Sequence, residues 1–138
     1  MERLTQDLTV GITGTREGTT RRQLEILKMN LEILWEQGYK RLAHGDCVGV
    51  DCSAHNIASK LGYFIQVHPP VNSSNRAFCS GDLILEEKDY LTRNKDIVDC
   101  CDLLLVVPKE DQEVLRSGTW STKRYATRKS KVINIIKP

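Results

Sequence analysis

Two glycine-bearing segments of the sequence combine residue types that bind anions. The first is Gly11-Ile12-Thr13-Gly14-Thr15-Arg16, and the second is Ser117-Gly118-Thr119-Trp120-Ser121-Thr122. Each follows an apolar, strand-like run and precedes a helix-like segment. The start of a helix offers unpaired backbone N–H groups and the positive end of the helix dipole. The two segments therefore predict a site for a phosphate-bearing, nucleotide-like ligand.

A third group of polar residues follows the second apolar run. His44, Gly45 and Asp46 end that run, and Gly49 and Asp51 come after a short turn. In α/β sheets a ligand lies outside the carboxyl ends of the strands, where the strand order reverses. We therefore expect this group to face the same cleft as the two glycine segments. Two alternatives stay open: Asp51 also suits the N-cap of the next helix, and His44 also suits a buried strand end.

The elements that must position these residues follow from the hydrophobic pattern. Five short apolar runs alternate with helix-like stretches, which predicts an α/β fold: a Rossmann-like, doubly wound, mainly parallel five-stranded sheet with helices on both faces. We expect strands at 8–13, 41–44, 63–68, 103–107 and 132–136. We expect helices at 19–36, 51–61, 88–101 and 119–129. The polar stretch 71–82 lacks a period and is interpreted as a functional loop or partial lid.

The composition is that of an ordinary globular chain. The 138 residues are 40% hydrophobic and 28% charged, and a net charge of +2 does not indicate a polyanionic partner. The chain has no long apolar span, and its five cysteines form no C-x-x-C pair, so we expect a cytoplasmic protein without membrane contact. Cys47 and Cys52, with His44 and His55 nearby, match no common zinc spacing. We therefore predict no metal and no cofactor.

The order and spacing of these motifs resemble the SLOG superfamily. This Rossmann-like group contains DNA-processing protein A, the Lonely Guy hydrolases and the YpsA and YspA-like proteins. The matching segments are Val10–Arg16, His44–Asp51 followed by Ala54, Arg93–Val98 before Asp102, and Ser117–Thr122. The resemblance covers nearly the whole chain and implies a single SLOG-like nucleotide-binding domain over residues 1–138. Because relatives with this fold commonly dimerise through helices, it also implies a homodimer.

One position departs from the hydrolases that the chain resembles. The Lonely Guy motif ends in a catalytic glutamate, and alignment of Gly118-Thr119 puts Thr122 in its place. A threonine hydroxyl does not replace a carboxylate beside an oxocarbenium-like centre. Arg93 matches the catalytic arginine of the family, and its guanidinium suits a phosphate or carboxylate. The alternative for Arg93 is an ion pair with Asp89 or Asp96 on its own helix.

Three functions remain open from the sequence. We favour a module that binds a nucleotide or nucleotide-derived molecule as a sensor or sequestering protein. The second is an N-glycosidic bond hydrolase in which Arg93 orients the substrate and a relocated carboxylate, first of all Asp46, acts catalytically. The expected ligand-binding residues are Gly11, Gly14, Thr15, Arg16, His44, Gly45, Asp46, Gly49, Asp51, Arg93, Asn94, Ser117, Gly118, Thr119, Trp120 and Thr122.

The third function is single-stranded DNA binding, as in DNA-processing protein A. A basic cluster near the C-terminus raises it: Lys123, Arg124, Arg128, Lys129 and Lys131. A single-strand platform interleaves cations with stacking rings, and Tyr125 is the one aromatic residue within this cluster. We therefore interpret the cluster as a solvated helix face, and nucleic acid as the lesser hypothesis.

Overall fold

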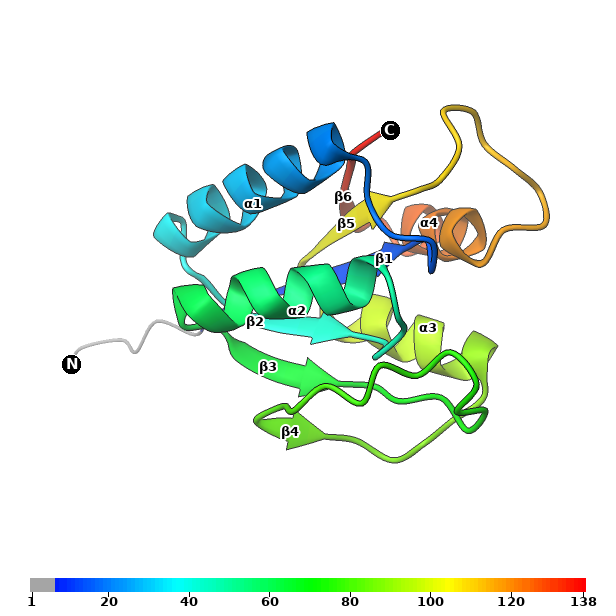
Figure 1. Ribbon diagram of the computed structural model, residues 1–138, viewed down its shortest axis with the longest axis horizontal. Coiled ribbons are helices and arrows are strands. Elements are labelled where there is room, and N and C mark those ends of the chain that lie inside the picture. Colours follow the sequence, from blue (N-terminus) through cyan, green and yellow to red (C-terminus); the bar gives the residue numbers. More distant parts are fainter. Residues whose placement is uncertain (1–6) are drawn as a thin grey trace.

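Buried strands and amphipathic helices alternate to form three layers, shown in Figure 1. A computed structural model describes residues 7–138. Its strands are β1 (Leu8–Gly14), β2 (Tyr39–His44), β3 (Phe64–Val67), β4 (Leu83–Ile84), β5 (Leu103–Val107) and β6 (Val132–Ile135). Its helices are α1 (Arg21–Glu36), α2 (Val50–Leu61), α3 (Tyr90–Cys100) and α4 (Gly118–Arg128). The predicted Rossmann-like α/β fold is confirmed.

The strands form one parallel sheet in the order β4-β3-β2-β1-β5-β6. Helices α1 and α2 cover one face, and α3 and α4 cover the other (Figure 1). The chain winds outward from β1 through β2, β3 and β4, then crosses to β5 on the other side of β1. The strand order therefore reverses between β1 and β5, which is where such sheets bind ligands.

The sheet has one strand more than the five that the sequence predicted. The additional strand, β4, pairs in parallel with β3 by joining Gln66 to Leu83 and Val67 to Ile84. Both residues of β4 are exposed, and two residues are too few to show the alternation of a strand. The other five strands and the four helices lie where they were expected, with ends shifted by at most two residues.

Helix α1 shows how tertiary contacts modify a sequence pattern. Thr20 caps it through a capping box with Gln23. The predicted apolar face included Leu24, but Leu24 is 41% exposed and Gln23 is buried in its place. The amide of Gln23 donates to Pro108 O at 2.8 Å and to Ile136 O at 2.9 Å. These bonds satisfy carbonyls at the ends of neighbouring segments, which an apolar side chain would leave unpaired.

The loops after β1 and β2 are packed directly against each other. Gly49 has a φ of +90°, and a Cβ there would lie 2.5 Å from the carbonyl oxygens of Thr15 and Arg16. The N–H of Val50 donates to Thr15 O at 3.1 Å. Gly49 is therefore required for this close approach, which fixes the first glycine segment beside the start of α2.

Candidate ligand-binding cleft

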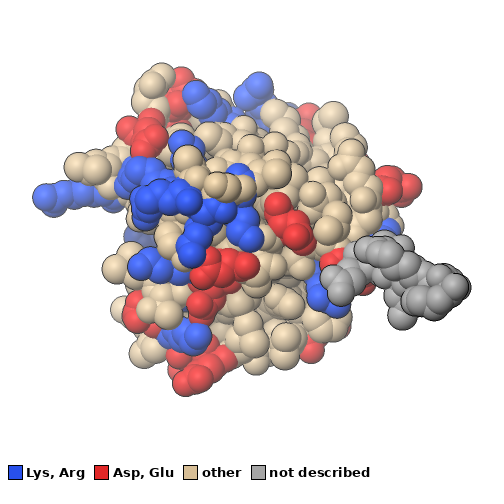
Figure 2. Space-filling view, turned by 180° about the vertical axis from the view of Figure 1, so that it is seen from behind, with Lys and Arg blue, Asp and Glu red and all other residues tan. Residues whose placement is uncertain are grey.

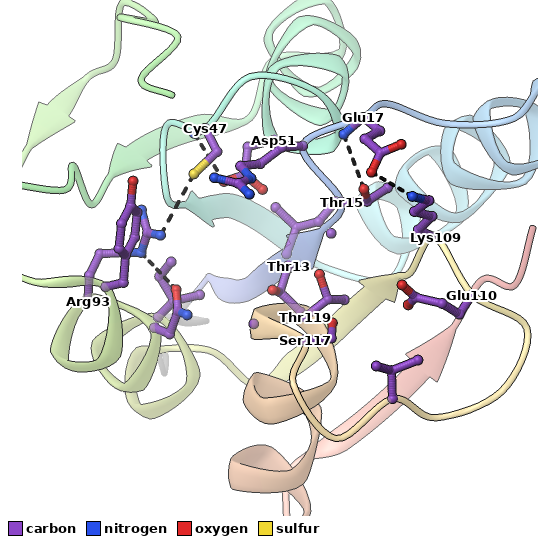
Figure 3. Close-up of a pocket in the computed structure, with 18 of the residues that line it drawn as sticks. Thr13, Thr15, Glu17, Cys47, Asp51, Arg93, Lys109, Glu110, Ser117 and Thr119 are labelled. Atoms are coloured by element: carbon purple, nitrogen blue, oxygen red, sulfur yellow. Dashed lines mark hydrogen bonds and ion pairs between the residues drawn. The ribbon is translucent and has the colours of Figure 1, made fainter. Parts of the chain in front are cut away.

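A cleft of about 470 Å³ lies at the carboxyl ends of β1 and β5, where the strand order reverses. Figure 3 shows its walls, which come from the loop after β1, the starts of α2 and α3, the loop after β5 and the start of α4. The lining residues are Ile12, Thr13, Gly14, Thr15, Arg16, Glu17, Cys47, Asp51, Tyr90, Arg93, Asn94, Ile97, Lys109, Glu110, Val114, Arg116, Ser117, Gly118 and Thr119. This volume suits a small molecule.

One end of the cleft is the N-terminus of α4. Ser117 is the N-cap, and its hydroxyl accepts the N–H of Trp120 at 3.2 Å. The first intrahelical bond runs from Ser121 N to Ser117 O, so the N–H groups of Gly118 and Thr119 precede the helical hydrogen bonding. Together with the helix dipole they offer donors for an anion.

Cations and carboxylates of the cleft divide into paired and unpaired groups. Lys109 Nζ lies 2.8 Å from Glu17 Oε2, a pair drawn on the right of Figure 3. Glu110 accepts the indole N–H of Trp120 at 3.0 Å. Within residues 7–138, no ion pair involves Arg16 or Arg116. These two arginines are therefore available to a bound anion.

Asp51 lies in the first turn of α2 and lines the cleft. The N-cap of α2 is Gly49, so Asp51 does not take the N-cap role that was its alternative. The Asp51 carboxylate accepts two backbone amides on Oδ2: Gly45 N at 3.0 Å and Cys47 N at 3.3 Å. Its Oδ1 is the single buried side-chain oxygen or nitrogen without a hydrogen-bond partner among residues 7–138. Burial raises the pKa of this carboxyl to about 6, although nearby Arg93 acts in the opposite direction.

Arg93 lies on the side of Cys47 that faces away from Asp51, at the left of Figure 3. Only 5% of Arg93 is exposed, and its guanidinium donates to Asn94 Oδ1 at 2.7 Å and to the Gly45 carbonyl oxygen. Its Nη2 meets only the Cys47 sulfur, at 3.8 Å, which is a weak acceptor. Neither alternative partner binds it, because Asp96 pairs with Lys88 and Asp89 caps α3 through Thr92.

The sequence-predicted residues therefore divide between the cleft and its surroundings. Lining the cleft are Gly14, Thr15, Arg16, Asp51, Arg93, Asn94, Ser117, Gly118 and Thr119. Outside its lining are Gly11, His44, Gly45, Asp46, Gly49, Trp120 and Thr122. Gly11 packs against Cys101 and Ile97, and Gly45 packs under the Arg93 guanidinium. Trp120 and Thr122 are buried, and Thr122 donates its hydroxyl proton to Gly118 O at 2.7 Å.

Asp46 is fully buried and anchors the segment 71–82 rather than facing the cleft. Its Oδ2 accepts Arg76 Nε at 2.7 Å, and its Oδ1 accepts Cys79 N at 2.8 Å. Its backbone carbonyl accepts Ala77 N at 2.7 Å. No residue of the segment 71–82, which was interpreted as a functional loop or partial lid, lines the cleft.

A cluster of metal-ligand residue types joins Cys79 of this segment to two histidines. One ligand atom each of His44, His55 and Cys79 lies within 4.8 Å of the other two. His44 Nδ1 accepts the Asp46 N–H at 2.9 Å, so a neutral His44 carries its proton on Nε2 and donates it to His55 Nδ1 at 3.1 Å. Burial lowers the pKa of His44 to about 3, which keeps the ring neutral. With this hydrogen bonding, His44 has no free lone pair for a metal.

Several lining residues were missed by the sequence analysis. Lys109, Glu110, Val114 and Arg116 lie in the loop after β5, where no periodicity marks a site. The residues 90, 93, 94 and 97 form one face of α3 at helical spacing, and this spacing together with the family arginine at 93 is a signal that extends the site to Tyr90 and Ile97. Cys47, Thr13 and Glu17 lie directly beside predicted residues in the chain.

Solved structures share this fold. The molybdenum cofactor binding protein of Rippkaea orientalis is similar with a TM-score of 0.74 at 20% identity, over 98% of this chain and 79% of that one. The molybdenum cofactor carrier protein of Chlamydomonas reinhardtii gives 0.70 at 17%, over 96% and 79%. DNA processing protein A of Helicobacter pylori gives 0.68 at 23%, over 93% of this chain but only 64% of that protein. No protein-family model and no curated protein sequence matches the chain.

These likenesses confirm the Rossmann-like α/β fold that the sequence predicted, and this chain shares that fold with all three proteins. Among residues 7–138, no helix is both long enough and apolar enough to cross a membrane.

Proposed function

We propose that this protein binds a nucleotide or nucleotide-derived small molecule in the cleft and holds it intact, as a sensor or sequestering module. The observation that carries the proposal is the anion-binding end of the cleft. There the free amides at the start of α4 combine with Arg16 and Arg116, which have no carboxylate partner among the described residues. A phosphate group matches that set of donors and positive charges.

The structural relatives support a binding function for this fold. Two of them are described as a binding protein and a carrier protein for the molybdenum cofactor, a small molecule. On this proposal Ser117, Gly118 and Thr119 bind phosphate together with Thr15 and Arg16. Asp46 and Asp51 are the two carboxylates among the expected ligand-binding residues. Because only Asp51 lines the cleft, Asp51 is the carboxylate that we retain for contacts to the ligand beyond its phosphate.

Calorimetry and mass spectrometry with a panel of nucleoside phosphates, NAD, ADP-ribose, cyclic nucleotides and molybdenum cofactor test the proposal. We expect intact ligand to be retained and Arg16→Ala to weaken its binding at least tenfold, because a charge-assisted hydrogen bond is lost. Arg21→Ala is the matched control, since the Arg21 side chain is 95% exposed and lies outside the cleft. Unchanged affinity in Arg16→Ala would show that the phosphate does not bind at the end of the cleft formed by Arg16 and the start of α4.

A second candidate is hydrolysis of a nucleotide N-glycosidic bond, and Asp51 is the observation that favours it. Its carboxyl has a pKa raised by burial to about 6 and an oxygen without a partner, and it lines the cleft. Such a group suits acid–base work near neutral pH. Chromatography for free base in the same incubations separates the two candidates. Base released by the wild type but not by Asp51→Asn would establish the enzyme.

Single-stranded DNA binding is a weaker candidate, although one structural relative is described by that activity. Figure 2 shows the face bearing α3 and α4, where lysine and arginine side chains gather on one side. Lys95, Arg128 and Lys129 surround the Tyr125 ring, and its hydroxyl donates to Asp99. The ring is thereby occupied rather than free to stack on a base. Retention of single-stranded DNA that falls steeply with salt would favour this candidate.

The expected homodimer stays a prediction. Sedimentation velocity with and without nucleotide measures it.

A further inference from the structure

The inner end of the cleft holds two buried polar groups of opposite character. Asp51 Oδ1 is an acceptor with no donor, and Arg93 Nη2 is a donor whose one contact is the Cys47 sulfur at 3.8 Å. Both residues line the cleft and are at most 6% exposed. Leaving such groups unsatisfied costs free energy, so a ligand that reaches this end gains by pairing with both.

Asp51 and Arg93 do not satisfy each other by forming an ion pair. No ion pair between Arg93 and Asp51 exists within 4.0 Å in the structure of residues 7–138. The Asp51 carboxylate is held through Oδ2 by the amides of Gly45 and Cys47, and the guanidinium is held by the Gly45 carbonyl and Asn94. These bonds fix both side chains from behind, so the acceptor and the donor are preorganised.

The walls around the two groups suit a flat ring. Tyr90 and Ile97 lie on the same face of α3 as Arg93, and the Arg93 guanidinium carbon lies 5.2 Å from the centre of the Tyr90 ring. Figure 3 shows the paired Lys109 and Glu17 on the far side of the cleft from Arg93, with Ser117 and Thr119 at the start of α4 between them. A ligand that binds its phosphate at α4 can therefore place its ring on the side of Asp51 and Arg93, away from the Lys109–Glu17 pair.

We propose that Asp51 and Arg93 select a ligand ring that presents an N–H next to a carbonyl. The N–H donates to Asp51 Oδ1, and the carbonyl oxygen accepts from Arg93 Nη2. Hypoxanthine, guanine and uracil carry this edge. Adenine and cytosine carry the reverse pattern, an unprotonated ring nitrogen beside an amino group, which sets an acceptor against Asp51 and a donor against Arg93. This inference rests on the proposed function, because it names the ring of the ligand that the cleft binds.

Two pairs of nucleotides test the inference in the wild-type protein. Inosine and adenosine monophosphates differ only at this edge, as do uridine and cytidine monophosphates. By calorimetry at pH 8, we expect the inosine and uridine nucleotides to bind at least tenfold more tightly than their amino counterparts, since each mismatch leaves a buried group unpaired. Equal affinities within both pairs would overturn the inference while leaving the proposed function intact. Failure of all four to bind, with none of the wider panel retained, would defeat both.

Asp51→Asn tests the role of the carboxylate without changing its size. The asparagine oxygen keeps the two amide bonds of Oδ2, so its NH₂ group takes the place of Oδ1 and presents a donor. We expect the inosine nucleotide to bind at least tenfold more weakly and the preference over the adenosine nucleotide to disappear. Asp102→Asn is the control, because Asp102 accepts Thr9 N at 2.8 Å near the amino end of β1, whereas the cleft lies at the carboxyl ends of the strands. An unchanged preference in Asp51→Asn would overturn the assignment, and thermal unfolding verifies that both variants are folded.

Discussion

At the scale of single residues, burial of Asp51 gives protein stability a particular dependence on pH. Burial raises the pKa of its carboxyl from 3.8 to about 6. Between these values the folded protein keeps a proton that the unfolded chain has released, so stability is lost as the pH rises through about 6. A shift of this size corresponds to about 3 kcal/mol in the free energy of unfolding at neutral pH.

Asp51→Asn should recover that loss because an amide does not ionise. We expect the variant to exceed the wild type at pH 7 by up to about 3 kcal/mol and to match it near pH 4. Urea unfolding at the two pH values measures the difference. Equal stability at pH 7 would mean that the carboxylate is solvated or paired in solution.

Asp46 is a buried carboxylate with a different role. Both of its oxygens are occupied, by Arg76 and by the Cys79 amide, and the Arg76 side chain is only 14% exposed. Asp46→Asn should therefore destabilise the protein by about 3 kcal/mol, the usual cost of breaking a buried ion pair. Ligand affinity should not change, because Asp46 does not line the cleft.

Chemical denaturation and calorimetry measure these two effects separately. A cycle with Arg76→Gln isolates the pair, and we expect the two losses not to add. Weaker ligand binding in Asp46→Asn at unchanged stability would return Asp46 to the list of binding residues.

At the scale of elements, the sequence predicts what periodicity encodes and misses what contacts impose. The run 103–107 is apolar throughout because β5 is buried on both faces, and its predicted bounds match the structure. By contrast, Gln23 replaces Leu24 in the buried face of α1 because of carbonyls far away in the chain. The two-residue strand β4 exists only by pairing with β3.

The same distinction applies to the cleft. Thr15, directly after β1, and Gly118, at the start of α4, follow from general rules for the carboxyl ends of strands and the starts of helices. Arg116 lies in an irregular loop, and no rule of spacing brings it to the cleft. The tertiary contacts of Asp46 are equally invisible in the sequence, because its partners lie about thirty residues away.

Position 122 in helix α4 is where the hydrolases that the chain resembles carry their catalytic glutamate, and its environment leads to a testable prediction. Thr122 is 4% exposed and its hydroxyl donates to Gly118 O, so a glutamate there would be a buried charge without a partner. We expect Thr122→Glu to destabilise the protein by about 3 kcal/mol or more and to release no free base from nucleotides.

Thr127→Glu provides the matched control on the same helix. Thr127 makes the same bond to the carbonyl four residues earlier, Lys123 O, but lies on an exposed part of the helix. It should lose less than about 1 kcal/mol. Base release by Thr122→Glu would show instead that the side chain at position 122 reaches the ligand.

At the scale of the whole molecule, buried histidines make the fold sensitive to acid. Burial lowers the pKa of His44 to about 3 and that of His68 to about 4. A base whose folded pKa is depressed contributes stability that is complete above its unfolded pKa of 6.5 and is lost as the pH falls toward the folded value. Between these two pKa values, each histidine lowers the free energy of unfolding by about 1.4 kcal/mol for every unit by which the pH falls.

Asp51 changes the free energy of unfolding in the opposite direction over part of this range. As the pH falls, the folded protein binds a proton at Asp51 before the unfolded chain does, and this stabilises the fold. Two histidines outweigh one carboxyl, so the free energy of unfolding should fall by about 2 kcal/mol between pH 7 and pH 5. Urea unfolding across this range measures the slope, and His68→Gln should make it shallower because one of the two buried bases is removed. His68 is the better choice for this variant, since His44 also holds the Asp46 amide and His55. A flat profile in the wild type would mean that protons reach both rings without unfolding, and the sheet edge around β2 and β3 would then open more readily than its burial implies.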